Sequence, residues 1–218
     1  MINKKTLSTR QTILDVACKL FSKFGYDNVT TRMVAEEAQV NQGSVHYHFG
    51  TKENLYVEVY KLANGTANAL EIETLLAEEP NLLETPEGKS YAIYRIVSDW
   101  FHRHFYVAEE WKPTLIYNEL FRPSPIYDRL VEEVFKPETT SRLRLYSMIA
   151  PDATDGEAYA WVHYPDSQAV YYWLTKKNII RYYGERFFED NKYLLMKFTI
   201  RNMLLALDLP ILKILKYK

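Results

Sequence analysis

Apolar residues recur every three or four positions through most of this sequence, which is the period of an α-helix with one buried face. The first such stripe comprises Ile13, Val16, Ala17, Leu20, Phe21 and Phe24. Few residues interrupt the pattern, because 218 residues contain 7 glycines and 9 prolines. This scarcity leaves room for long helices and argues against a hairpin-rich sandwich or barrel. We therefore expect an all-α protein.

Capping and breaking residues divide the chain into predicted helices. Ser8 and Gln11 have capping-box spacing, and Gly25 ends the first helix. Thr30 or Thr31, Asn41 and Thr51 are suitable caps for the next three. Further along, Pro113, Pro123, Pro125, Pro137 and Pro210 mark breaks. The predicted helices cover residues 9–24, 31–38, 42–49, 52–77, 90–107, 113–121, 126–135, 138–149, 166–183 and 189–207, with clear loops at 80–88 and 151–156.

Charge is distributed unevenly along the chain. Residues 1–52 carry seven Lys or Arg against four Asp or Glu, whereas the remainder is slightly acidic and the whole chain has a net charge of −1. A basic head on an acidic body suits a protein that touches phosphate groups at one end only.

The single cysteine, Cys18, excludes an internal disulfide framework and fits a reducing cytosol. No apolar run approaches the roughly 20 residues that span a bilayer. The first residues hold two lysines with no apolar segment behind them, so we expect no signal peptide. These features predict a cytoplasmic protein without a membrane partner.

Residues 30–56 have the parts of a helix-turn-helix, in which two short helices meet at a tight turn and the second enters the DNA major groove. The positions expected to face inward are Val34, Ala35, Ala38, Val40, Val45 and Phe49. The other side of the second helix presents Gln42, Gly43, Ser44, His46, Tyr47 and His48, and Gly43 lets the backbone approach DNA closely.

This segment resembles the DNA-binding head of the TetR family over roughly residues 8–60. The matching positions are Thr30, Arg32, Val34, Ala35, Ala38, Val40, Gly43, Val45, His48, Phe49, Lys52 and Leu55. The resemblance implies an N-terminal three-helix head with a helix-turn-helix, at residues 1–52. It also implies a larger C-terminal helical domain for effector binding and dimerisation, at residues 53–218. Two positions depart from the family: Gln39 replaces the turn glycine, and His46 replaces a tyrosine.

The same resemblance implies roles for the exposed residues. Arg32 and Gln42 would read bases, because Arg pairs well with guanine and Gln with adenine in the major groove. The residues expected to contact the phosphate backbone are Thr31, Ser44, His46, Tyr47, His48 and Lys52. The resemblance then implies a transcriptional regulator, and a repressor because repression is the commoner role in the family, that binds a palindromic operator as a homodimer and is released by a small molecule.

The C-terminal part resembles the CecR-like branch of these regulators at Glu119, Arg122, Pro123, Ser124 and Pro125. It also holds most of the tyrosine and tryptophan excess, and such side chains could line a pocket for a planar or amphipathic ligand. The predicted pocket residues are Trp100, His104, Tyr117, Glu119 and Tyr146. The alternative is that most of the aromatic residues belong to the core or an interface, which is the commoner outcome for any single one.

Two late helices have broad apolar faces that predict a four-helix dimer interface, although a monomer could use them as core. These residues are Val170, Tyr171, Trp173, Leu174, Leu194, Leu195, Phe198, Met203 and Leu204.

Other functions have weaker sequence support. An enzyme is not expected, since nucleotide-binding and hydrolase motifs are absent and the nearest cluster, His163, Asp166 and Ser167, has no supporting pattern. His46 with His48, and His102 with His104, are two residues apart and point in different directions on a helix, so neither pair predicts a metal site. No cofactor is expected. The remaining alternative is a helical ligand-binding protein that has lost DNA binding.

Overall fold

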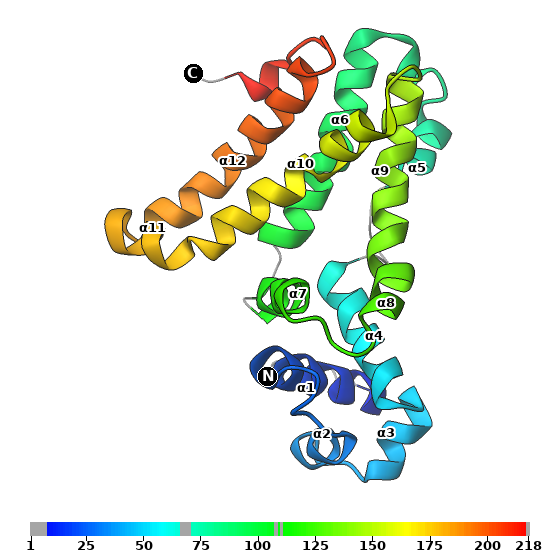
Figure 1. Cartoon of the computed structure of the whole chain (residues 1–218), viewed down its shortest axis with the longest axis vertical. Helices are drawn as coiled ribbons and strands as arrows, with labels where there is room; N and C mark the ends of the chain where they lie inside the picture. Colours follow the sequence, from blue (N-terminus) through cyan, green and yellow to red (C-terminus); the bar gives the residue numbers. More distant parts are fainter. Residues whose placement is uncertain (1–7, 66–70, 107–108, 110, 217–218) are drawn as a thin grey trace, which may run out of the picture. The chain divides into compact units, whose positions relative to one another are not determined.

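The protein is helical throughout its regular elements, as the sequence predicts. The computed structural model describes residues 8–65, 71–106, 109 and 111–216, and no strand occurs among them. The chain forms two compact units (Figure 1). Unit 1 comprises Met1–Ala67 and Ala108–Lys136, and unit 2 comprises Asn68–Val107 and Pro137–Lys218.

Unit 1 contains the helices that carry the predicted DNA-binding residues. Its helices are α1 (Thr9–Phe24), α2 (Thr31–Glu37), α3 (Gln42–Phe49), α4 (Lys52–Asn64), α7 (Trp111–Phe121) and α8 (Tyr127–Leu130), with a π-helical turn at Val131–Phe135. The first four begin where a polar side chain accepts a hydrogen bond from a backbone N–H two or three residues inside the helix. These caps are Ser8, Thr30, Asn41 and Thr51, as predicted.

A single core joins these helices. Ile13 and Phe21 of α1, Val34 of α2, Val45 of α3 and Leu55 of α4 are each at most 1% exposed. Helix α4 packs against both α1 and α7. The packing unit is therefore larger than residues 1–52, and the functional division at residue 52 stays a prediction.

The long helix predicted over residues 52–77 is wrong. Helix α4 ends at Asn64, because Gly65 adopts a left-handed backbone with φ of +63° and its N–H turns back to the carbonyls of Lys61 and Leu62. Residues 66–70 of the predicted helix lie outside the described residues. A separate short helix, α5 (Ile72–Glu78), follows.

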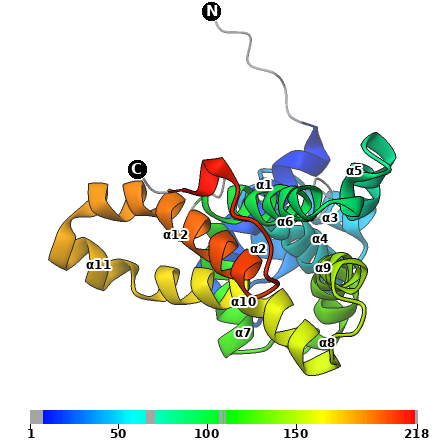
Figure 2. The same cartoon turned by 90° about the horizontal axis from the view of Figure 1, so that it is seen from above.

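Unit 2 has its own core, centred on Ile93, Phe101, Leu145, Val162 and Ile200, all fully buried. Its helices besides α5 are α6 (Pro86–Phe101), a π-helix at His102–Tyr106, α9 (Lys136–Ile149), α10 (Asp155–Leu174), α11 (Lys176–Tyr183) and α12 (Glu185–Leu205). Helices α10 and α12 lie side by side, and α11 joins them at one end (Figure 2).

The predicted start of a helix at residue 166 is also wrong. Helix α10 begins eleven residues earlier, where Thr154 and Glu157 form a complete capping box. It continues past the buried ring of Pro165 and ends at Leu174, so the predicted 166–183 segment is two helices. Proline also starts a helix in this unit: Pro86 occupies the first turn of α6, where a missing N–H costs little.

Within the described part of the chain, no helix is both long and apolar enough to cross a membrane. The same residues hold no group of three or more His, Cys, Asp or Glu that could bind a metal ion. Cys18 is buried among the core residues of unit 1, and burial raises the pKa of its thiol to about 12.

Candidate nucleic-acid interface

Helices α2 and α3 form a helix-turn-helix whose inner faces are sealed. Ala35 and Val45 are 3% and 1% exposed, and Phe49 is 6% exposed. A small side chain at position 35 allows the two helices to pack closely, and α3 is further held by α1 and α4. Residues predicted to face inward on the two helices are therefore buried in the core of the head.

The turn between the helices needs a left-handed residue, and Gln39 supplies it with φ of +55°. The N–H of Val40 then donates to the carbonyl of Ala35 at 3.0 Å, which closes the end of α2. A non-glycine residue in this conformation costs on the order of 1–2 kcal/mol.

We expect Gln39→Gly to increase the free energy of unfolding by roughly 0.5–1 kcal/mol, because the relief of this strain exceeds the added entropy of an unfolded glycine. Chemical denaturation of both proteins measures it. Gln39→Ala keeps the Cβ atom and should show no gain. A glycine variant less stable than the parent would contradict the proposed strain.

The recognition helix α3 starts at a double cap. The backbone N–H of Ser44 donates to Asn41 Oδ1 at 2.8 Å, and the Ser44 hydroxyl donates to the same oxygen at 3.1 Å. A Cβ atom at Gly43 would lie 3.1 Å from that oxygen, which is tighter than an ordinary contact. The absence of a side chain at Gly43 therefore protects the cap.

The outer face of α3 presents the residues that the sequence predicts for DNA contact. Gln42, Gly43, His46 and Tyr47 are exposed, Tyr47 to 85%, and the half-buried residues of the face are Ser44 and His48. Gln42 Nε2 donates to Thr31 Oγ1 at 3.3 Å, which ties the start of α3 to the start of α2. His46 donates from Nδ1 to the carbonyl of Gly50 at 2.8 Å, so its ring orientation is fixed.

Arg32 is anchored from within its own helix. Its Nε donates to Glu36 Oε1 at 2.8 Å, one helical turn along α2, and both side chains are well exposed. The hydrogen bond to Glu36 and the charge of that carboxylate raise the pKa of Arg32. Glu36 is a candidate functional residue that the sequence analysis does not predict, although its i, i+4 spacing from Arg32 is typical of an ion pair on a helix.

Lys52 stands at the start of α4 over an aromatic ring. Its Nζ lies 4.0 Å from the ring centroid of Tyr26, and the Tyr26 hydroxyl donates to Glu53 Oε1 at 2.9 Å. Burial lowers the pKa of Lys52. Burial and the bond to Glu53 raise the pKa of Tyr26 to about 12. The ammonium group is thus held in place beside the recognition helix.

The predicted effector residues fall into both units. In unit 2, the His104 ring stacks on Trp100 at 4.5 Å between centroids, and its Nδ1 donates to the Trp100 carbonyl at 2.9 Å. Burial lowers the pKa of His104. Tyr146 is buried and packs on Trp161 with 5.0 Å between ring centroids.

In unit 1, Tyr117 packs against the core, and Glu119 is almost fully buried. Glu119 accepts hydrogen bonds from the Tyr56 hydroxyl at 2.8 Å and from the N–H and hydroxyl of Ser124 at 2.8 and 2.7 Å. Tyr60, one turn after Tyr56, donates to the Leu115 carbonyl at 2.6 Å. These contacts give Glu119 a structural role in joining α4, α7 and the Pro-Ser-Pro loop, and its assignment to a ligand stays a prediction.

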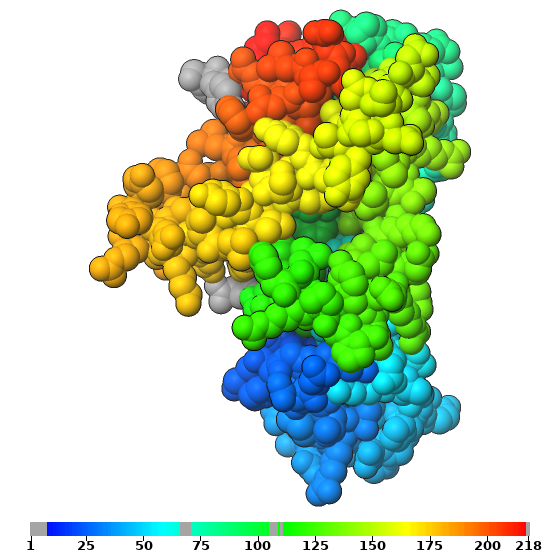
Figure 3. Space-filling model, viewed as in Figure 1, coloured from blue at the N-terminus to red at the C-terminus, as the bar shows by residue number. Residues whose placement is uncertain are grey.

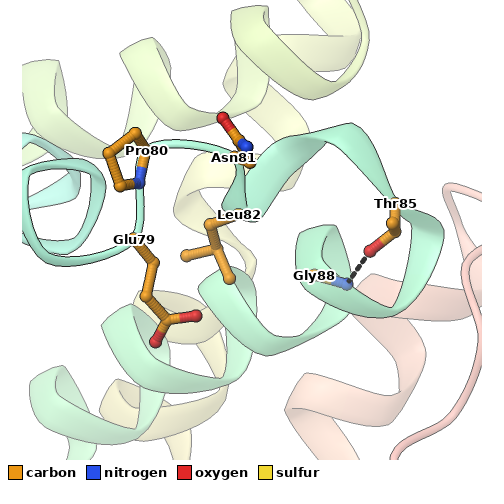
Figure 4. Close-up of a pocket in the computed structure, with 6 residues that line it drawn as sticks. All are labelled: Glu79, Pro80, Asn81, Leu82, Thr85 and Gly88. Atoms are coloured by element: carbon orange, nitrogen blue, oxygen red, sulfur yellow. Dashed lines mark hydrogen bonds between the residues drawn. The ribbon is translucent and has the colours of Figure 1, made fainter.

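Unit 2 also has an open surface pocket, which none of the predicted effector residues lines (Figure 4). Its lining residues, none of them predicted to bind a ligand, are Glu79, Pro80, Asn81, Leu82, Thr85 and Gly88.

The cluster of His163, Asp166 and Ser167 does not have the geometry of a hydrolase active site. Asp166 accepts a hydrogen bond from His163 Nδ1 at 3.1 Å, but its main partner is the guanidinium group of Arg142, which donates two hydrogen bonds at 2.9 and 3.0 Å. The Ser167 hydroxyl donates to the carbonyl of Tyr164 at 2.8 Å. Arg142 is buried, and its Cζ atom lies 5.7 Å from the centroid of the Trp100 ring. No local sequence signal indicates that this arginine is buried.

Comparisons with known proteins support the assignment of the N-terminal helices as a DNA-binding head. Residues 13–59 match the family model of bacterial regulatory proteins of the tetR family. The transcriptional regulator AcrR of Shigella flexneri is 38% identical over 65 residues, which are 30% of this chain and 30% of AcrR. The transcriptional repressor AcnR of Corynebacterium glutamicum is 30% identical over 93 residues, which are 42% of this chain and 50% of AcnR. The matched part of the chain thus spans between 30% and 50% of the length of these relatives.

The fold is shared over a longer stretch. NalD, described as the secondary repressor of the MexAB-OprM multidrug efflux pump in Pseudomonas aeruginosa, superposes with a TM-score of 0.60 and 18% identity, covering 88% of this chain and 95% of NalD. These relatives are named as regulators of transcription and not as enzymes. Residues 13–59 therefore form a DNA-binding head of the tetR family, and the chain as a whole has the helical fold of TetR-type regulators.

Proposed function

We propose that this protein binds a palindromic operator as a homodimer, represses transcription and is released by a small-molecule effector. The observation that carries the proposal is the recognition helix α3, which buries Val45 and Phe49 and leaves Gln42, His46 and Tyr47 open to solvent. Rigid inner packing with an exposed polar face is what entry into a major groove requires.

Two residues read bases in this proposal. Arg32 offers donors to guanine, and Gln42 offers one donor and one acceptor to adenine. The residues that hold the phosphate backbone and fix the register of the head are Thr31, Ser44, His46, Tyr47, His48 and Lys52, while the bare backbone at Gly43 approaches the DNA.

Helices α10 and α12 provide the proposed dimer interface. The exposed apolar residues of α12 lie on one stripe with spacings of seven, four and seven: Phe187, Leu194, Phe198 and Leu205 are 42–52% exposed. Tyr171 and Leu174 add exposed apolar surface on α10, and these helices lie at the surface of the molecule (Figure 3). By contrast, Met203 and Leu204 are buried in the core of unit 2 and do not serve the interface.

Dimerisation suits the function because one short recognition helix has too little surface for specific binding. Two heads about 34–36 Å apart reach successive major grooves on one side of the duplex, and two-fold symmetry explains a palindromic site.

The effector site is proposed for the aromatic cluster of unit 2, where Trp100, His104 and Tyr146 could hold a planar or amphipathic molecule. Tyr117 and Glu119 are retained as weaker candidates in unit 1. Because binding to operator and effector is linked, the effector must lower DNA affinity by the same factor as DNA lowers effector affinity. A protein that acts on the chromosome in this way works in the cytoplasm.

The proposal is tested by selecting genomic DNA fragments with the purified protein at two salt concentrations. We expect enrichment of a palindromic site with a steep loss of affinity as salt rises. Arg32→Ala should remove the base preference at one position of each half-site, a loss of about 10-fold or more, since a good bidentate pair contributes about 1–3 kcal/mol of discrimination. Failure of the folded protein to enrich any site at low salt would instead favour a ligand-binding protein without a DNA partner.

A further inference from the structure

The side chains of Arg32 and Glu36 are arranged so that only part of the guanidinium group is engaged. Glu36 Oε1 accepts from Nε of Arg32 at 2.8 Å. Within the described part of the chain, neither terminal nitrogen of Arg32 has a hydrogen-bond partner. An arginine has five N–H groups in a planar fork, and the two terminal nitrogens form one edge of it.

That edge is the one that can face O6 and N7 of a guanine in a bidentate contact. A carboxylate on Nε fixes the plane of the guanidinium group and keeps the remaining edge available. The side chain of Arg32 is 77% exposed and that of Glu36 is 63% exposed, so the pair lies on the solvent side of α2 and is open to a partner.

A carboxylate in a DNA-binding head would otherwise be a disadvantage, since it repels phosphate. Glu37 is the adjacent exposed carboxylate, and no hydrogen bond or ion pair engages it within the described residues. The two acids thus carry the same charge at neighbouring positions, but only Glu36 contacts a candidate base reader.

We propose that Glu36 is a positioning residue for sequence recognition: it holds Arg32 in the orientation that reads guanine and prevents Arg32 from pairing with phosphate groups. This inference rests on the proposed role of Arg32 as a base reader. Loss of Glu36 should leave DNA binding intact but less selective, because a released arginine binds any nearby phosphate.

The test compares Arg32→Ala, Glu36→Ala, Glu36→Gln and Glu37→Ala as full-length proteins, on the selected operator and on operators changed at each position. Alanine is favourable within a helix, and thermal unfolding confirms that each variant is folded. Glu36→Ala should reduce the preference for guanine at the Arg32-dependent position about 5–10-fold, a large part of one bidentate contact. It should also steepen the salt dependence by about one phosphate contact.

Glu37→Ala is the matched control, because it removes the same charge without touching Arg32. It should raise affinity for all DNA sequences by one common factor and leave the guanine preference unchanged. Glu36→Gln keeps an acceptor for Nε and should restore at least half of the lost preference.

Two failures are distinguishable. If Arg32→Ala leaves every base preference intact, Arg32 is not a base reader and both the proposed contact and the role of Glu36 are overturned. If Arg32→Ala removes a guanine preference that Glu36→Ala retains, or if Glu36→Ala and Glu37→Ala behave alike, only the positioning role of Glu36 is overturned.

Discussion

Replacing Leu194 and Phe198 together by aspartate should convert the protein into a monomer at micromolar concentration and abolish operator binding. The two side chains are 46% and 51% exposed and stand four residues apart on α12. Two-fold symmetry places four such side chains in the proposed interface, and each half-exposed Leu or Phe contributes about 1 kcal/mol by burial. The total of about 4 kcal/mol corresponds to roughly 1000-fold in the dimer dissociation constant. The desolvation of four carboxylates increases the effect.

Sedimentation velocity measures the change, and fluorescence anisotropy with operator DNA measures its consequence. Met148→Asp on α9 is the control, because Met148 is 43% exposed but lies outside the α10 and α12 stripe. It should remain dimeric. A double aspartate variant that is still a dimer would move the interface to another face of the molecule.

The head was predictable because its signals act over short distances. The oxygens of Ser8, Thr30, Asn41 and Thr51 each cap a backbone N–H within three residues, so the sequence contains both partners side by side. Even the departure at Gln39 could be placed, since the resemblance to the TetR family puts the turn residue there, and Gln39 is left-handed in the structure. The pairing of Arg32 with Glu36 is equally local, because the two residues are one helical turn apart.

Two predicted helix boundaries are wrong, although a local signal marks each observed one. The helix predicted from residue 166 begins at Asp155, directly after the capping box of Thr154 and Glu157. Helix α10 continues past Pro165, whose ring is buried, although a proline removes one hydrogen bond from the helix interior. Similarly, the helix predicted over residues 52–77 runs through Gly65, whose left-handed conformation ends α4.

The polar contacts of unit 2 could not be predicted, because they join residues that are distant in the sequence. Arg142 and Asp166 are 24 positions apart and lie on α9 and α10. A single arginine with an apolar neighbour gives no indication that it will be buried. Asp166 becomes the partner of Arg142 only when α9 and α10 come together, and the spacing of apolar residues along the sequence does not reveal which helices do so.

Asp166→Asn should destabilise unit 2 by about 3–5 kcal/mol, because it leaves a buried guanidinium group without its counter-charge. The Arg142 side chain is 5% exposed, and both of its terminal nitrogens donate to Asp166. Its Nε has no hydrogen-bond partner within the described residues, so little else compensates the charge. Replacing the partner instead, by Arg142→Met, should lower the free energy of unfolding less, because the Asp166 side chain is 29% exposed and keeps its contact with His163.

Lowering the pH should reduce the contribution of the Arg142–Asp166 ion pair to the stability of unit 2. Burial tends to raise the pKa of Asp166, but the charge of Arg142 and the hydrogen bonds of His163 and Arg142 outweigh it, so the folded pKa is below the usual value. A carboxyl group with a lowered folded pKa contributes its full stability above the unfolded pKa, near 3.9. That contribution is lost as pH falls below about 4 through the folded pKa. The difference between the parent and Asp166→Asn should therefore be largest at neutral pH and shrink in acid.

Urea denaturation followed by tryptophan fluorescence provides the measurement, since Trp100, Trp161 and Trp173 all lie in unit 2. Asp190→Asn is the matched control, because it makes the same exchange in the exposed pair of Arg186 and Asp190, which should contribute less than about 1 kcal/mol. The double variant Arg142→Met with Asp166→Asn should be more stable than Asp166→Asn alone, because it no longer buries an unpaired charge. If Asp166→Asn costs no more than Asp190→Asn, water or another group must compensate the charge of Arg142, and the pair does not stabilise the packing of α9 on α10.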